Sequence, residues 1–169
     1  HMAFAVVGGY TAALVAASSA QKATMLPDLP SFIADVQLDP YIAVMVGGLA
    51  AACVAALVAI PLVRVSGLTA GLATVALLLV VRSVVINWDA VTRGNRGLSP
   101  LPVSTSLTSA LVWASGAILV TYAFQRSRSG RRLSASKEDE PAAVSVGIGI
   151  GSHRAIALVL SGFITGVGG

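Results

Sequence analysis

The densest group of acidic side chains in this 169-residue sequence lies in the segment SKEDEPAAVSVGIG, residues 136–149. Acidic residues stabilise the positive end of a helix, and proline suits its first turn. The segment therefore predicts a short helix capped by Ser136 or Glu140, with a smooth alanine face and glycines that end it. Such a helix would serve as a docking element for a partner protein, whereas the simpler interpretation is a solvated charged loop.

A second polar segment, TRGNRGL at residues 92–98, follows an apolar stretch. Glycine lets backbone N–H groups approach a ligand closely. Irregular backbone at membrane depth is tolerated where it lines a water-filled cavity. The segment therefore predicts either part of a pathway for a polar solute or an exposed turn.

Signatures of catalysis are missing from the sequence. No Gly-x-x-x-x-Gly-Lys-[Ser/Thr] motif is present, which argues against ATP binding through a P-loop. A metal site needs three or four ligands, but the two histidines, His1 and His153, are isolated and Cys53 is the single cysteine. We therefore expect no enzyme activity, no metal site and no cofactor bound by this chain.

Composition places these segments in a membrane protein. Hydrophobic residues make up 56% of the chain and charged residues only 11%, too few to cover a soluble domain. The net charge of +4 is not accompanied by aromatic residues interleaved with the basic ones, so we expect membrane lipid and not nucleic acid as a partner.

Five apolar stretches predict helices, at residues 3–20, 41–63, 67–86, 107–124 and 155–169. A spanning helix needs about 20 mostly apolar residues, and the alternation expected of barrel strands is absent. The prediction is an all-α, polytopic transmembrane helix bundle with about five spans and a short cytoplasmic coupling helix. Arg82 is the one charge inside a span, where it either serves function or extends to the membrane surface.

The connections between spans differ in charge. Residues 125–152 and the link that contains Arg64 hold six basic residues, whereas residues 21–40 and 88–106 hold three. Cytoplasmic loops carry an excess of lysine and arginine. Loop 125–152 and Arg64 are therefore expected in the cytoplasm, and loops 21–40 and 88–106 outside.

The acidic segment resembles the EAA loop of ABC-importer permeases, where an acid, two alanines and a glycine form the helix that docks on the ATPase. Here these are Glu140, Ala142, Ala143 and Gly147. The resemblance implies that an ATPase binds at residues 138–147, through Glu138, Asp139, Glu140, Ala142, Ala143 and Gly147.

More of the chain is similar to the LivM-type permeases of branched-chain amino acid ABC importers. Three motifs carry this resemblance: His1, Phe4, Gly8, Tyr10, Ala12 and Ala13; then Pro61, Arg64, Gly67 and Thr74; then Thr92, Gly94 and Gly97. His1 is therefore either native or part of an added dipeptide. One departure is Arg93, which stands where the family has the middle glycine of its Thr-Gly-Gly turn.

The resemblance implies a permease subunit that translocates branched-chain amino acids or similar small polar solutes in a bacterial inner membrane, with ATP consumed by a separate ATPase. The implied partners are cytoplasmic ABC ATPase subunits, a LivH-type second permease and an extracytoplasmic substrate-binding protein. The expected substrate pathway includes Tyr10, Thr74, Thr92, Gly94, Asn95 and Gly97. Residues 1–169 would form one permease domain, an internal fragment of a longer chain, with the EAA-like loop at residues 125–152 within it.

An alternative function is that of a secondary transporter or channel without an ATPase. Such a protein would rely on polar groups within the membrane for ion coupling. The spans offer only Arg82 and no acidic residue, which argues against proton coupling.

Overall fold

A computed structural model of the chain describes residues 1–26, 36–65, 67–94, 97, 105–138, 140–147 and 149–169. These residues form helices and no strand, which confirms the predicted all-α class. The helices are α1 (Met2–Ala16), α2 (Ser19–Met25), α4 (Pro40–Leu62), α5 (Gly67–Asn87), α6 (Asp89–Thr92), α7 (Leu107–Arg126), α8 (Arg128–Glu138), α9 (Glu140–Ser145) and α10 (Ile150–Gly168).

Four of the described helices, α4, α5, α7 and α10, are long and apolar enough to cross a membrane. The apolar helix α1 is shorter, at 15 residues. The five predicted apolar stretches thus correspond to five helices. The last one begins at Ile150, five residues before its predicted start, because Gly149 precedes its first turn and Ile150 is buried.

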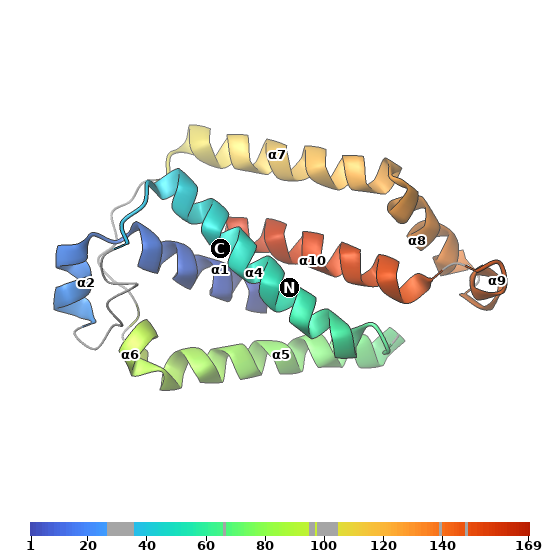
Figure 1. Cartoon of the computed structure of the whole chain (residues 1–169), viewed down its shortest axis with the longest axis horizontal. Helices are drawn as coiled ribbons and strands as arrows, with labels where there is room; N and C mark the ends of the chain where they lie inside the picture. The colour runs from blue at the N-terminus through green and yellow to red at the C-terminus, as the bar shows by residue number, and fades with distance from the viewer. Residues whose placement is uncertain (27–35, 66, 95–96, 98–104, 139, 148) are drawn as a thin grey trace.

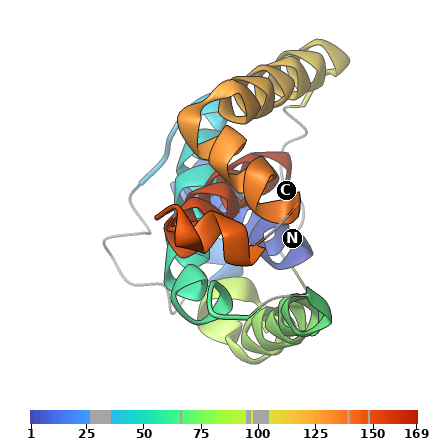
Figure 2. The ribbon, with the colours of Figure 1, turned by 90° about the vertical axis from the view of Figure 1, so that its right-hand side faces the viewer.

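The centre of the molecule is a bundle of α1, α4 and α10, which pack against one another along their lengths (Figures 1 and 2). On α4 a small residue recurs every fourth position on the buried face. Residues four apart lie on one face of a helix, and small residues there let helix backbones approach closely. The residues of this repeat are Ala43, Gly47, Ala51, Ala55 and Ala59, and Gly48 is buried beside them.

Glycines at the contacts between these three helices show how close the backbones are. A Cβ added at Gly47 of α4 would lie 2.5 Å from the carbonyl oxygen of Gly8 in α1. A Cβ added at Gly8 would collide with the backbone of Gly166 in α10. A Cβ at Gly162, four residues earlier in α10, would lie 2.5 Å from the Cβ of Ala55. No side chain larger than hydrogen fits at these positions.

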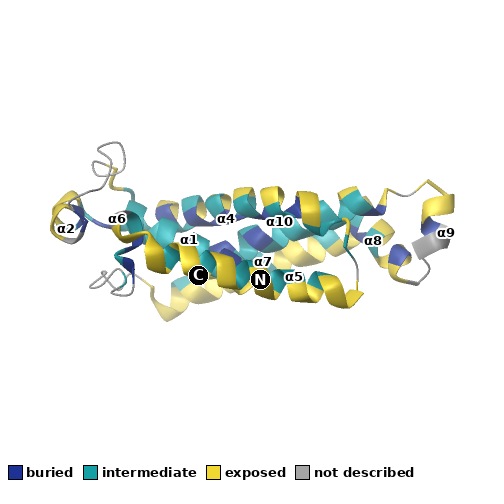
Figure 3. Ribbon diagram, turned by 90° about the horizontal axis from the view of Figure 1, so that it is seen from below, coloured by how far each residue is buried: buried dark blue, intermediate teal, exposed yellow. Residues whose placement is uncertain are grey.

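The helices α5 and α7 lie outside this bundle. Neither contains a buried residue, and their leucine and valine side chains are exposed along most of their length (Figure 3). Helix α5 contacts α1, whereas α7 is held mainly through α8. In a membrane these apolar faces are suited to contact lipid.

The connections between spans lie at two opposite ends of the molecule (Figures 1 and 3). One end carries α2 and α6. The other end carries α8, α9 and the link between α4 and α5, which contains Arg64. The basic connection at residues 125–152 and Arg64 therefore share one end of the bundle.

Candidate functional site

The polar segment at residues 136–149 is not one continuous loop. Helix α8 extends through Ser136 and ends at Glu138, and α9 begins at Glu140. The prediction that Ser136 caps the short helix is wrong. Ser136 is buried within α8, where its hydroxyl donates a hydrogen bond to the carbonyl oxygen of Leu133 at 2.8 Å. The reason is tertiary, because α8 packs against α10 and continues through Ser136 to Glu138.

Helix α9 has the short length and the glycine end that the sequence predicts. Pro141 occupies its second position, and Gly147 adopts a left-handed φ of 79° two residues after the helix ends. The Gly147 N–H donates to the carbonyl oxygen of Val144 at 2.9 Å. Val144 and Val146 are 59% and 75% exposed. This end of the bundle therefore presents exposed apolar side chains, which follow the acidic residues in the sequence.

The expected docking residues occupy different parts of this segment. Glu138 is the last residue of α8, and Glu140 and Ala142 belong to α9. Ala143 of α9 is buried against its neighbours. Asp139 lies outside the described residues. The described part of the segment thus belongs to the end of α8 and to α9, between α7 and α10.

The joint between α7 and α8 is one residue long. The N–H of Ser127 donates to the carbonyl oxygen of Phe124 at 3.0 Å, and its hydroxyl accepts from the N–H of Gly130 at 3.2 Å. A Cβ added at Gly130 would collide with the Phe124 carbonyl and lie 2.8 Å from the Gln125 Cα. Glycine is required here, and α8 is fixed tightly against the end of α7.

The glycine-rich turn after α5 forms a compact cap. Thr92 is buried, and its hydroxyl contacts the carbonyl oxygens of Trp88, at 2.8 Å, and Val85, at 2.5 Å. The N–H of Gly94 lies 3.4 Å from the same hydroxyl oxygen. Arg93 has a left-handed φ of 58°, a conformation that glycine adopts most readily. The backbone at Arg93 would therefore suit glycine better, and glycine is the residue at this position in the permease family that the chain resembles.

The remaining expected pathway residues lie apart from this cap. Tyr10 is half-buried in α1, and Gly97 has a left-handed φ of 64° with open space around it. The hydroxyl of Thr74 in α5 donates to the carbonyl oxygen of Gly71 at 2.7 Å. Asn95 lies outside the described residues. Thr74 and Thr92 thus make hydrogen bonds to the backbone of their own region.

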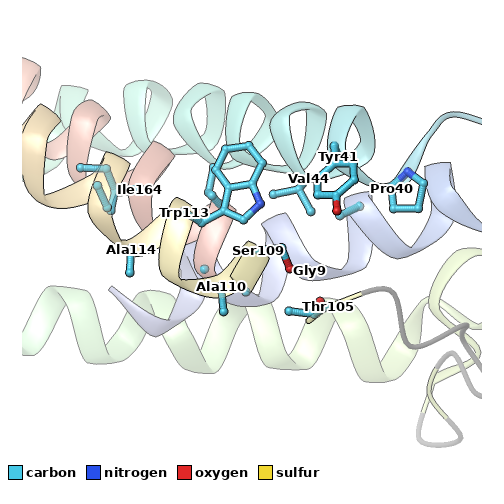
Figure 4. Close-up of a pocket in the computed structure, with 15 residues that line it drawn as sticks. Gly9, Pro40, Tyr41, Val44, Thr105, Ser109, Ala110, Trp113, Ala114 and Ile164 are labelled. Carbon is cyan, nitrogen blue, oxygen red and sulfur yellow. The ribbon is translucent and has the colours of Figure 1, made fainter. Parts of the chain in front are cut away.

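A cavity of about 530 Å³ separates α7 from the central bundle (Figure 4). Its wall is mostly apolar, with hydroxyl groups from Thr105, Ser109 and Tyr41. Trp113 of α7 projects towards the core helices from the middle of its span. Other lining residues include Gly9, Ala12, Val44 and Ile164. Ligand sites are commonly apolar hollows with a few polar groups, so this cavity is suited to a small amphiphilic molecule.

None of the expected pathway residues that the structure describes lines this cavity. Its lining comes from α1, α4, α7 and the end of α10, which are far apart in sequence. One local signal was available, because Trp113 lies in the middle of an apolar stretch and tryptophan in spans is concentrated at the membrane interfaces. The other lining residues are spread over several helices, so no single segment of the sequence indicates that they share a cavity.

Comparison with protein families gives one match across the whole chain. A family model described as "Branched-chain amino acid transport system / permease component" matches residues 1–169. The chain belongs to this permease family. Comparisons with curated proteins and with solved structures give no match.

Membership in the permease family agrees with the architecture. Four helices of membrane-spanning length and a shorter apolar helix make this a multi-pass membrane protein. The permease family accounts for the apolar outer faces of α5 and α7 and for the scarcity of charge. The match confirms the resemblance to branched-chain amino acid transport permeases.

Proposed function

We propose that this permease is the membrane-spanning subunit of an ABC importer, of the LivM type, for branched-chain amino acids or similar small polar solutes. The family match across the chain supports this function, together with the motifs in α1, after α4 and after α5. A LivH-type second permease completes the pathway, and an external binding protein delivers the solute. The chain itself is neither an enzyme nor a cofactor-binding protein.

The ATPase docks at residues 138–147. The observation that carries this proposal is α9, a short helix at the end of the bundle with Val144 exposed on it and Val146 exposed directly after it. Exposed apolar side chains beside charged ones are typical of a docking surface. This end also carries Arg64 and the arginines of α8, so the excess of positive charge supports a cytoplasmic position. Loops 21–40 and 88–106 are then external, in a bacterial inner membrane.

Transport follows a change between two arrangements of the permease. Binding of ATP closes the ATPase dimer, which moves the docked helix and shifts the permease between inward-open and outward-open states. The energy comes from ATP in the partner subunits. Ion coupling within this chain is disfavoured, because the five apolar helices contain no acidic residue.

The test is uptake by the reconstituted importer with its ATPase. Glu140→Lys and Val144→Asp should both abolish solute uptake while leaving membrane insertion and the thermal stability of the permease unchanged. Gln37→Lys, which adds a positive charge to an exposed residue at the opposite end, is the control and should transport normally. Normal uptake by both α9 variants would refute the docking site.

A secondary transporter or channel is the alternative, and the same system separates the two. An importer takes up solute only when the ATPase and ATP are present. Uptake by the permease alone, driven by a proton or sodium gradient in liposomes, would favour the alternative and reject the ABC importer.

A further inference from the structure

Three arginines occupy one face of α8. Arg128, Arg131 and Arg132 have the spacing i, i+3 and i+4, which places their side chains next to one another on a helix surface. All three are exposed. A fourth, Arg126, ends α7 two residues before Arg128, and its guanidinium lies 4.7 Å from the centre of the Tyr122 ring.

The opposite face of α8 is fixed against the rest of the molecule. Gly130 is buried and Leu133 is half-buried on this face, and α8 contacts α10. The Ser127 joint fixes the other end of α8 to α7. The arginine face therefore cannot turn inward and remains directed away from the bundle.

These arginines make no ion pair within the described part of the chain. Like charges at i, i+3 and i+4 destabilise a helix, so three adjacent guanidinium groups are unfavourable without an anion. Guanidinium binds phosphate oxygens in a bidentate manner. The face therefore has the chemistry of a phosphate site.

The position of the arginine face relative to the membrane indicates which kind of phosphate group it can reach. The span α7 ends at Arg126, and α8 begins at Arg128 after the single residue Ser127. At a rise of about 1.5 Å per residue, Arg128 to Arg132 lie within about 10 Å of the end of the apolar helix. Lipid headgroups occupy this depth next to the hydrocarbon core.

We infer that Arg128, Arg131 and Arg132 form a binding site for the phosphate headgroup of an anionic phospholipid. The site would fix α8 at the membrane surface. It does not depend on the proposed ATPase docking, because its three arginines lie in the first half of α8, before residues 138–147. Juxtamembrane basic clusters attract anionic lipid in proportion to their charge.

The test is native mass spectrometry of the full chain in detergent, titrated with phosphatidylglycerol or with phosphatidylcholine of the same acyl chains. The unaltered chain should bind phosphatidylglycerol at least tenfold more tightly. Arg131→Gln should weaken that binding about fivefold, and R128Q/R131Q/R132Q should remove the preference. The matched control Arg64→Gln, an exposed and isolated arginine at the same end, should bind as the unaltered chain does.

Further variants keep the result interpretable. R128K/R131K/R132K retains the charge and should keep a preference for phosphatidylglycerol, and circular dichroism checks that every variant retains its helices. Retention of the preference by the triple glutamine variant would overturn the site. So would competition by soluble glycerol phosphate at the same concentration as the lipid, which would assign a free anion. A third outcome is that the unaltered chain shows no lipid preference and that the triple glutamine variant no longer co-purifies with the ATPase. This outcome would overturn the lipid site and assign the arginine face to the ATPase.

Discussion

Helices α4 and α5 are neighbours in the chain with similar length and apolar character, yet the structure holds them in different ways. Helix α4 has six buried residues, all alanine or glycine, and contacts both α1 and α10. Helix α5 has none. The difference is in the spacing of small residues, because α4 repeats them every fourth position whereas α5 gathers them in its first half. Apolar composition thus identifies a span, but small-residue spacing decides whether it packs in the core.

The largest expected difference in stability is between truncating an apolar side chain in the core and truncating one on the outer helix α5. Phe4 is 2% exposed and packs with Ala51 and Ala55, whereas Leu79 of α5 is 60% exposed. Phe4→Ala should lower the free energy of unfolding by about 3 kcal/mol, because it leaves a cavity in the core. Leu79→Ala should change it by less than about 0.5 kcal/mol. Denaturant unfolding in detergent, followed by circular dichroism, measures both, and equal effects would show that α5 is packed as firmly as α1.

The same glycine substitution should have opposite effects in the two regions. Gly8→Ala forces a Cβ into the backbone of Gly166 and should destabilise the bundle by about 2 kcal/mol. Gly71→Ala in α5 meets nothing within 4 Å and should stabilise by about 0.5 kcal/mol through helix propensity. Thermal unfolding of the two variants gives the comparison. Tolerance of Gly8→Ala would mean that the three central helices are not in close contact.

The stability of helix α5 should depend more on the hydrogen bonds at its C-terminal end than on its packing against other helices. Thr92→Val removes the hydroxyl that contacts the Val85 and Trp88 carbonyls and should cost about 1 kcal/mol. The loss should appear as faster amide hydrogen exchange in the last turn of α5. Thr69→Val, at an exposed threonine near the start of the same helix, should leave that exchange unchanged.

The smallest effect is expected at Arg93, which has a left-handed backbone. Arg93→Gly should stabilise the chain by about 0.5 kcal/mol, because glycine adopts this conformation without a steric cost. The midpoint of thermal unfolding should therefore rise slightly. A fall would show that the Arg93 side chain contributes more than its backbone costs.

Hydropathy was sufficient to predict the spans, because burial in lipid and burial in protein select the same residue types. Helix α8 was missed, since RSGRRLSASKE has the polar composition of a loop and is helical where it packs on α7 and α10. The early start of α10 was missed because His153 and Arg154 interrupt the apolar pattern. Apart from Trp113, the wall of the cavity was not predictable, because it is assembled from helices distant in sequence.

The one-residue joint at Ser127 has a mechanical consequence. Helix α7 has little contact with the core and is tied to it mainly through α8, so any tilt at the Ser127 joint would move α7 as one rigid arm. An arm of 20 residues is about 30 Å long, and a tilt of about 10° at the pivot would move its far end by about 5 Å. The far half of the arm carries Ser109 and Trp113, which line the cavity. A small rotation of α8 would therefore be amplified into a change in the width of the cavity at the opposite end of the molecule.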